Sequence, residues 1–423
     1  MKPVTAVIIG GGLRGYAAYA IKANPKTLNV VGVAEPVEYK RQMCAERFGI
    51  APENCFASYE DLLSKPKMAD LAIICTPDDM HFEPAKMAAE KGYHILLEKP
   101  ISPKAEEIYE IGQIAAKSDK IFSICHVLRY TKFYIKLKEI LDSGRIGKLV
   151  HMIHSENVAY WHQAHSFVRG NWRNSVETSP MILAKCCHDM DILLYLIGSK
   201  CKTISSMGDL TFFKKENAPE GAPARCLDGC PEYDTCPYCA PKLYLHNSYL
   251  RSWGLENLFD IPDTSDESIL KALETNQYGR CVFQCDNDVV DHQSATIEFE
   301  NGVTVSFTMC AFTNENTRVM RLMGTHGEIV ADFDNNIIKV RDFVTDNVEK
   351  ITIGPAALGH GGGDAGLMNA VVSAINGCDT NKTSAVESVE SHMMALAAEK
   401  SRVTGKTIVL DEFVAEIAAK CSK

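Results

Sequence analysis

The chain of 423 residues is 46% hydrophobic and 23% charged, with a formal net charge of −10. These values are ordinary for a globular protein, and the length predicts two domains. The negative charge is spread without a basic block, which argues against nucleic acid or an anionic membrane surface as a partner. No apolar run approaches the roughly 18 residues that cross a bilayer. Without a signal-peptide pattern, we expect a cytoplasmic protein whose sixteen cysteines are reduced thiols or metal ligands.

The first segment combines a short apolar run with a glycine-rich turn. Gly10, Gly12 and Gly15 follow the run in GxGxxG spacing. Such glycines permit a tight turn, close approach of the backbone to a pyrophosphate, and close packing of helix on strand. The helix that follows offers unpaired N–H groups to phosphates, so Leu13 and Arg14 join the glycines as predicted cofactor contacts.

A second predicted strand, residues 29–35, ends in an acidic residue. Glu35 lies about 20 residues past the last glycine, where a carboxylate binds the ribose hydroxyls of a dinucleotide. Because the same carboxylate repels a 2′-phosphate, the sequence favours NAD. Lys40 and Arg41 keep NADP open, and a simple strand end is the alternative role for Glu35.

Two further apolar runs, residues 71–75 and 94–97, are typical of buried parallel strands. The carboxyl ends of such strands meet at one edge of the sheet, where the cofactor binds. Lys99, just after the second run, is placed to reach a reacting centre, although a charged strand end is often only solvated. The predicted cofactor contacts at this edge are Thr76, Pro77, His81, Glu98 and Lys99.

Residues 1–125 are therefore predicted to form an α/β Rossmann domain with a doubly wound parallel sheet. Residues 126–423 differ in pattern. Segments such as QSATIEFE and GVTVSFTMCAF alternate apolar and polar residues, as antiparallel strands with one exposed face do. We expect this second domain to be α+β, with an open, largely antiparallel sheet.

The glycine turn, the acidic end of the second strand, TPDDMH, EKP and a later HxxD segment occur in one order along nearly the whole chain. In this combination the chain resembles the Gfo/Idh/MocA oxidoreductases, which include glucose–fructose oxidoreductase and inositol dehydrogenase. The resemblance implies NAD-dependent oxidation of a carbohydrate or cyclitol hydroxyl. It also implies a homodimer or homotetramer that assembles through the exposed face of the open sheet.

The segment MILAKCCHDMDIL, residues 181–193, is predicted to be the catalytic helix of the second domain. On one helix, Lys185 and His188 would share a stripe. His188 and Asp191 match the DxxxHxxD pattern of the resembled family, whereas Ala184 stands in place of its first aspartate. The resemblance implies that His188 is the general base and that Lys99 stabilises the reacting oxygen. Lys185 and Asp191 are then substrate contacts, and Lys185 alternatively tunes His188; the competing interpretation is a core histidine satisfied by Asp191.

The loop AYWHQAHSFVRGNWRN before this helix is rich in aromatic side chains, which pack on the C–H faces of sugars. We expect Tyr160, Trp161 and His165 to contact substrate, and Trp172 and Arg173 to contact the cofactor. His292, which follows Asp291, either reaches the same cleft or only begins a strand.

His360 and Asp364 flank three glycines before a helix, and both are predicted substrate contacts. A similar turn occurs in the NAD-dependent glycosidase branch of the resembled family. A glycosidase that retains NAD and acts by transient oxidation, elimination and re-reduction is therefore the alternative function, while an N-capping turn is the plain structural explanation. A non-catalytic NAD sensor is the third possibility.

A cysteine-rich insertion is predicted near residues 220–245. Cys226, Cys230, Cys236 and Cys239 have the spacing C-x3-C-x5-C-x2-C in a loop rich in Pro and Gly. Four thiolates so close in sequence predict a structural Zn²⁺ site. Free thiols, or a ligand set that borrows Cys186 or Cys187, are the alternatives.

Overall fold

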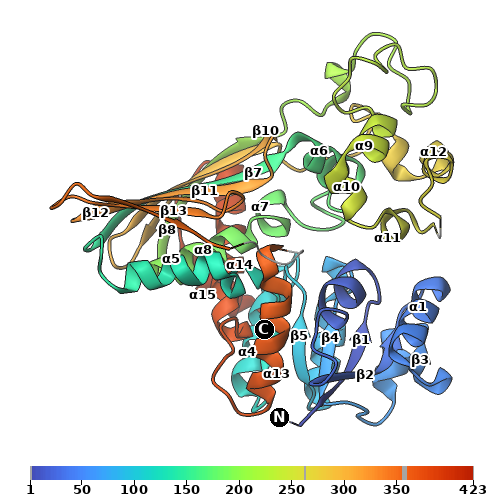
Figure 1. The fold of residues 1–423 in the computed structure, drawn as a ribbon, viewed down its shortest axis with the longest axis horizontal. Coiled ribbons are helices and arrows are strands. Elements are labelled where there is room, and N and C mark those ends of the chain that lie inside the picture. The colour runs from blue at the N-terminus through green and yellow to red at the C-terminus, as the bar shows by residue number, and fades with distance from the viewer. Residues whose placement is uncertain (1, 262, 355–359, 423) are drawn as a thin grey trace.

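The structure is a computed structural model that describes residues 2–261, 263–354 and 360–422. It contains two β-sheets joined by helices, with a helical insertion beside the second sheet (Figure 1). The Rossmann sheet and the open sheet predicted from the sequence are both confirmed.

The first sheet has the strand order β3-β2-β1-β4-β5-β6, and every neighbouring pair is parallel. Its central strands are buried on both faces because helices cover both, so all their residues except His94 at the start of one strand are apolar. The strands are β1 (Val4–Ile9), β2 (Leu28–Ala34), β3 (Cys55–Phe56), β4 (Leu71–Ile74), β5 (His94–Leu97) and β6 (Phe122–Ile124). The helical segments are η1 (Leu13–Ala20), α1 (Glu38–Phe48), η2 (Pro52–Asn54), α2 (Tyr59–Ser64), η3 (Asp78–Met80), α3 (Phe82–Glu90) and α4 (Ala105–Lys117).

The glycine turn between β1 and η1 is tight because backbone atoms approach it closely. Gly10 has φ +93°, and a Cβ added there would lie 2.4 Å from the carbonyl oxygen of Cys75. A Cβ on Gly15 would lie 2.1 Å from the carbonyl oxygen of Gly10. Only glycine fits at these two positions, so the chain can turn sharply from the end of β1 into η1.

The second sheet has the order β14-β13-β12-β11-β7-β10-β9-β8-β15. Only β7 and β10 pair in parallel, and the other neighbours are antiparallel. The strands are β7 (Leu149–Ala159), β8 (Cys201–Asp209), β9 (His292–Phe299), β10 (Thr304–Thr313), β11 (Thr317–Gly324), β12 (Gly327–Asp332), β13 (Ile337–Asp342), β14 (Val348–Thr352) and β15 (Ile408–Val409).

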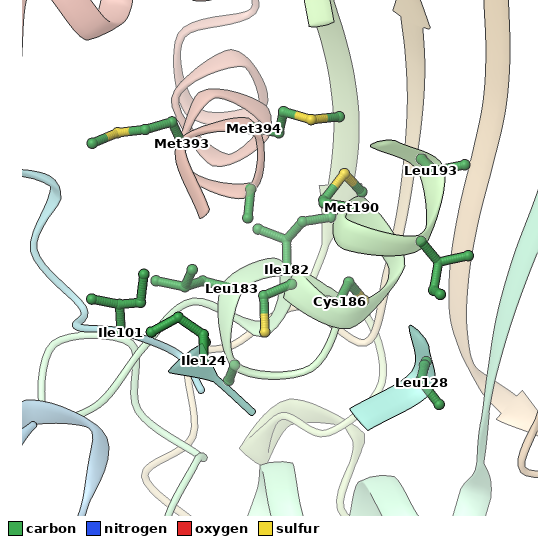
Figure 2. Packing of buried hydrophobic residues seen from close by; sticks show 14 of the residues in the cluster. Ile101, Ile124, Leu128, Ile182, Leu183, Cys186, Met190, Leu193, Met393 and Met394 are labelled. Atoms are coloured by element: carbon green, nitrogen blue, oxygen red, sulfur yellow. The ribbon is translucent and has the colours of Figure 1, made fainter. Parts of the chain in front are cut away.

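Helices cover one face of this sheet, and no helix of the described residues covers most of the other face (Figure 1). The helical segments here are η4 (Val127–Tyr130), α5 (Lys132–Asp142), α7 (Met181–Ala184), α8 (Cys187–Ile197), η8 (His360–Gly362), α13 (Gly363–Ile375), α14 (Ala385–Thr404) and α15 (Leu410–Cys421). In the packing of α7 and α8 near α14, Ile182, Leu183, Cys186 and Met190 lie together with Met393 and Met394 (Figure 2). Cys186, two residues before the candidate base His188, thus belongs to the core.

Late in the chain, α13 returns to the first sheet. Leu367, Met368 and Val371 are buried in one cluster with Ala6 and Ile8 of β1. The helix α14 instead contacts α4, α8 and β8, so it ties the nucleotide-binding half to the second sheet. The sequence had instead suggested that α13 and α14 both belong wholly to the second domain.

The insertion is larger than the segment near 220–245 that the sequence suggested. Helices and turns between β8 and β9 surround a separate aromatic and cysteine-rich core, which also takes in residues of α6 and η5. Lys40 of α1 pairs with Asp260 of this insertion at 2.7 Å. The helical segments are α6 (Tyr160–His162), η5 (Gln163–Arg169), η6 (Lys215–Asn217), α9 (Ala240–His246), α10 (Ser248–Ser252), α11 (Leu255–Phe259), α12 (Asp266–Thr275) and η7 (Gln277–Gly279).

Candidate active site

The carboxyl ends of β1, β4 and β5 meet at one edge of the first sheet, as the parallel order requires. His81 joins two of the loops there: its Nδ1 lies 2.6 Å from the Pro100 carbonyl and its Nε2 lies 2.8 Å from the Thr76 carbonyl. The imidazole is buried. His81 therefore fixes Thr76 and Pro77 beside the segment that carries Lys99.

The residues at the glycine turn fit a dinucleotide. A Cβ on Gly12 would meet nothing within 4 Å, so the backbone there borders open space. Glu35 is buried, and its carboxylate accepts hydrogen bonds from the N–H groups of Gly11 at 2.8 Å and Val37 at 3.0 Å. These bonds hold the carboxylate at the end of β2, where a ribose would bind.

Arg14 links the glycine turn to the end of β5. Its Nε donates to Glu98 at 2.5 Å, and Tyr19 Oη donates to the same carboxylate oxygen at 2.7 Å. Burial raises the pKa of Glu98, but the charges of Arg14 and Lys99 outweigh burial and hold the pKa below its usual range. Glu98 is thus an anion that anchors the two cations on either side of it.

Lys99 reaches from the first sheet to the segment before α8. Its Nζ donates a hydrogen bond to the Ala184 carbonyl at 2.9 Å. That carbonyl lies at a break in the predicted helix, because α7 ends at Ala184 and α8 begins at Cys187. The expected single helix over residues 181–193 was therefore wrong.

His188 lies in the first turn of α8, one turn beyond the contact made by Lys99. Its side chain is buried, and its Nδ1 has no hydrogen-bond partner among the described residues. The imidazoles of His126 and His360 lie 5.7 and 6.0 Å away between ring centroids. Burial, followed by the charge of Lys99, lowers the pKa of His188 well below its usual value. The ring is therefore neutral at physiological pH and has an unused nitrogen.

The turn from His360 to Asp364 also reaches His188. His360 Nδ1 lies 3.1 Å from Asp364 Oδ1, and the Asp364 carboxylate accepts from Arg14 at 3.3 Å and from Lys22 at 3.0 Å. Burial opposes ionisation of Asp364, but the hydrogen bond from His360 and the charge of Arg14 lower its pKa. The structure thus brings His360 to His188, and Asp364 to the glycine turn.

Lys185 does not share a stripe with His188, because the helix breaks between them. Its ammonium pairs with the buried Glu156 of β7 at 3.0 Å. Glu156 also pairs with Arg318 at 2.9 Å, and Arg318 donates to Asp189 at 2.8 Å. Lys185 therefore belongs to an ion-pair network between α8 and the second sheet.

Asp191 is bound by Arg129 of η4. Arg129 holds its carboxylate with two hydrogen bonds, from Nε at 2.8 Å and from Nη2 at 2.7 Å. His126 Nε2 lies 3.8 Å from the same carboxylate. The competing interpretation, in which Asp191 satisfies His188, has no hydrogen bond to support it among the described residues.

The two residues of the long loop that were predicted to contact the cofactor, Trp172 and Arg173, lie in different parts of the structure. Trp172 Nε1 donates to both carboxylate oxygens of Asp78, at 3.2 and 3.1 Å, and so bridges the two halves of the molecule at the cleft. Arg173 instead pairs with Asp286 at 2.8 Å, at the edge of the insertion.

The predicted substrate residues of the same loop lie with the insertion. Trp161 is buried and stacks on Tyr249, with centroids 5.5 Å apart. His165 is buried and its Nδ1 lies 2.8 Å from Tyr244 Oη. Tyr160 is partly buried against the same core. His292 is exposed at the start of β9, beside Asp291 at 2.8 Å. The structure does not bring these four side chains to Lys99 and His188 by any described contact.

The four cysteines of the insertion do converge on one small cavity, which Cys281 also lines. Among residues 2–261, 263–354 and 360–422, however, no three His, Cys, Asp or Glu side chains are placed to hold a metal ion. Cys186 and Cys187 are buried in the core of the second domain. The predicted tetrahedral zinc site therefore finds no support in this arrangement.

Sequence reasoning missed three residues of the site. Asp78 lies in TPDDMH, but only a folded structure reveals its partner Trp172. Tyr19 sits inside the helix after the glycine turn, where it resembles any core aromatic residue. His126 follows β6, and its place at the carboxyl end of a parallel strand was a signal that we did not use.

A parallel sheet with a glycine turn and an acidic strand end, together with the matching family models, defines an NAD-binding oxidoreductase. The chain belongs to the Gfo/Idh/MocA family. The family model for the NAD-binding Rossmann fold matches residues 4–126, and the model for the C-terminal alpha/beta domain matches residues 138–410. No helix within the described ranges is both long and apolar enough to cross a membrane.

Several known proteins are similar to this chain. The putative oxidoreductase YteT of Bacillus subtilis is 20% identical, over 80% of this chain and 81% of its own length. Inositol 2-dehydrogenase of Salmonella typhimurium is 26% identical, over 47% of this chain and 56% of its own length. The 2,7-anhydro-N-acetylneuraminate hydratase of Mediterraneibacter gnavus is 25% identical, over 49% of this chain and 53% of its own length. This chain therefore spans only about half the length of the last two. A structure of levoglucosan dehydrogenase with NADH and levoglucosan is 18% identical, with a TM-score of 0.72 over 97% of this chain and all of that one.

Proposed function

We propose that this protein transfers a hydride between a hydroxyl-bearing carbon of a sugar, glycoside or cyclitol and bound NAD. The observation that carries the proposal is the pairing of Lys99 with the segment of His188. Lys99 donates to the Ala184 carbonyl at 2.9 Å, and the buried His188 one turn later has an unused Nδ1. A cation and a neutral imidazole thus lie close together near the carboxyl edge of the first sheet.

When it is bound, NAD supplies the hydride acceptor. His188 takes the proton from the substrate hydroxyl, for which its lowered pKa keeps it in the neutral form. Lys99 hydrogen-bonds the same oxygen and stabilises the negative charge that develops there. Glu98, which Arg14 and Tyr19 hold in place, fixes the backbone that carries Lys99 through its contact with the Lys99 N–H at 2.6 Å. Arg14, Glu35 and the open backbone at Gly12 are the proposed dinucleotide contacts.

The proposal is tested with the variant Lys99→Met. Purified protein is incubated with NAD and a panel that includes myo-inositol and levoglucosan, and NADH is followed by its absorbance. We expect turnover to fall by at least about a hundredfold, while NAD binding, measured by calorimetry, stays within severalfold. Lys104→Met, at an exposed ion pair with Glu107, is the matched control. Unchanged turnover in Lys99→Met would remove the lysine from the mechanism.

A second candidate, an NAD-retaining glycosidase, is supported by the turn at His360. This imidazole lies 6.0 Å from that of His188 and is held by Asp364, so two histidines border the same space. Two bases fit a sequence of oxidation, elimination and re-reduction, in which protons leave from two positions. A relative named as a hydratase also suits chemistry without net oxidation.

The two candidates differ in what accumulates. The oxidoreductase releases NADH in proportion to product. The glycosidase consumes a glycoside without net NADH, and NAD copurifies with the protein. Tight NAD binding with no turnover on any sugar or glycoside of the panel would instead support a non-catalytic sensor.

We also propose that the protein is a homodimer or homotetramer built through the uncovered face of the second sheet. Ile153 of β7 and Val330 of β12 both pair with Arg321 of β11, so the two side chains share a row across the sheet. Both are exposed in the single chain, at 41% and 38%. A broad sheet face with apolar side chains in its middle favours association.

A further inference from the structure

The insertion contacts the first domain at the helix that follows β2. Asp260, immediately after α11, forms an ion pair with Lys40 of α1, and 2.7 Å separates Lys40 Nζ from Asp260 Oδ1. Figure 1 shows α11 lying next to α1. Lys40 is in the first turn of that helix, only a few residues past Glu35. A carboxylate of the insertion thus reaches the helix that begins just after the proposed ribose-binding carboxylate.

Cations near the end of the second strand decide whether a dinucleotide-binding sheet of this kind accepts NADP. A basic side chain there binds the 2′-phosphate that distinguishes NADP from NAD. The first turn of α1 carries two such side chains, Lys40 and Arg41. Glu35 repels a 2′-phosphate, but a free ammonium or guanidinium beside it would attract one. The cofactor preference therefore depends on what these two cations bind.

Both cations have partners within the protein. Arg41 Nη1 donates to the carbonyl of Glu35 at 2.5 Å and to that of Pro36 at 3.2 Å, so the guanidinium lies against the backbone at the end of β2. Lys40 differs because its partner is a carboxylate, which neutralises its charge. Its side chain is only 15% exposed, whereas that of Asp260 is 59% exposed. Asp260 therefore covers an ammonium that has little other access to water.

The backbone at Asp260 does not by itself favour an aspartate. Asp260 has φ +56° and ends α11 (Leu255–Phe259) in the left-handed conformation. Glycine is the usual residue in this conformation at a helix end, because it has no Cβ to clash. The carbonyls at the end of a helix also disfavour a neighbouring anion. The ion pair with Lys40 is the interaction that offsets these local costs.

We propose that Asp260 is a specificity residue for the cofactor, which acts through Lys40 and excludes NADP by keeping that ammonium from the 2′-phosphate. The inference rests on the proposed dinucleotide contacts at Glu35. Glu35 repels the phosphate directly, and Asp260 removes the cation that would compensate for this repulsion. Without Asp260, the long and flexible side chain of Lys40 is free to reach a phosphate at the end of β2.

The test measures the dissociation constants of NAD and NADP by calorimetry at low ionic strength. In Asp260→Asn, the constant for NADP should fall by about fivefold, while that for NAD should stay within about twofold. Adding Lys40→Met to this variant should cancel the gain. Lys40→Met alone should change the ratio of the two constants by less than about twofold, because the paired ammonium is not available to a phosphate.

A control within the insertion separates this effect from a general loss of charge. Asp266 forms an ion pair with Arg251 at 3.1 Å, and its side chain is 68% exposed. Asp266→Asn therefore removes a comparable carboxylate away from α1 and should bind both cofactors as the wild type does. The gain in Asp260→Asn should also shrink at high salt, because salt screens the attraction between an ammonium and a phosphate.

Three results would overturn the inference. The first is an unchanged NADP constant in Asp260→Asn, and the second is a gain that persists when Lys40→Met is added. The third is an equal loss of NAD and NADP binding in Asp260→Asn and in Lys40→Met, which would assign the ion pair to docking of the insertion alone.

Glu35→Ala, measured in the same series, shows which idea has failed. If it shifts the ratio toward NADP and Asp260→Asn does not, the ribose site stands and only the role of Asp260 is wrong. If neither variant shifts the ratio, the ribose binds elsewhere and both assignments fall. Because all readouts are binding constants, the proposed hydride transfer is tested separately by turnover.

Discussion

Burial lowers the pKa of His188, the proposed base. A buried imidazole resists protonation because the charged form loses water, and the positive charge of Lys99 acts in the same direction. A buried nitrogen without a partner costs about 1–3 kcal/mol, and in a folded protein such a cost is typical of a functional site.

The pH dependence of turnover follows from this lowered pKa. Because His188 binds its proton less tightly than a free histidine, kcat/KM should stay level as the pH falls through about 6.5. Activity should decline only at lower pH, where the imidazole becomes protonated. His188→Gln should lower kcat by about 10²–10⁴, whereas His246→Gln, at an exposed position, should not. A decline centred at or above pH 6.5 would argue against His188 as the base.

Glu35 carries the choice between NAD and NADP. Its buried carboxylate, fixed by the N–H groups of Gly11 and Val37, leaves a 2′-phosphate facing a negative charge. Glu35→Ala should shift the ratio of the two dissociation constants toward NADP by at least about tenfold, or about 1.4 kcal/mol. Glu38→Ala, in the exposed first turn of α1, should leave the ratio unchanged. Titration of each protein with NAD and with NADP measures this ratio. Equal affinity of the wild type for both cofactors would contradict the proposed role of Glu35.

At the scale of elements, the glycine turn joins β1 to η1. There is no room for a side chain at Gly15, whereas there is room for one at Gly12. Gly15→Ala would place a methyl group 2.1 Å from a backbone oxygen, so the free energy of unfolding should fall by about 1–3 kcal/mol. Gly12→Ala meets no atom of the protein and should leave unfolding unchanged. It should instead weaken NAD binding by tenfold or more, because the methyl group enters the proposed path of the pyrophosphate. Thermal unfolding and NAD titration of both variants separate the effects; a stable Gly15→Ala would contradict the packing argument.

The break between α7 and α8 marks the limit of prediction from local pattern. Periodicity over residues 181–193 supports one helix, and it gave the type of the element correctly on both sides of the break. Lys185 leaves the stripe because its ammonium pairs with Glu156, while the nearby Ala184 carbonyl accepts from Lys99. Both partners are distant in sequence, so no local rule contains them. The same reason hid Arg129 as the partner of Asp191.

At the scale of the whole molecule, the sequence predicted both sheets, because each strand type has its own pattern: continuous apolar runs for the parallel sheet and alternation for the open one. It predicted Lys99 and His188 as catalytic residues through a resemblance, and in the structure Lys99 donates to the Ala184 carbonyl one turn before His188. The sequence did not predict against which of the two sheets each connecting helix packs. An amphipathic helix such as α13 must bury its apolar stripe, but the pattern does not say against which sheet.

The uncovered face of the second sheet leads to the last prediction, which concerns assembly. A stable interface buries at least about 1,000 Å², and the row through Ile153, Arg321 and Val330 lies across the centre of this face. Ile153→Lys would bury an unpaired ammonium in the interface, so the dissociation constant of the oligomer should rise by about tenfold or more. Val403→Lys, on the exposed end of α14, is the matched control and should assemble as the wild type does. Sedimentation velocity over a concentration series measures both variants. A wild-type chain that sediments as a monomer throughout, or an Ile153→Lys variant that associates unchanged, would place the interface elsewhere or remove it.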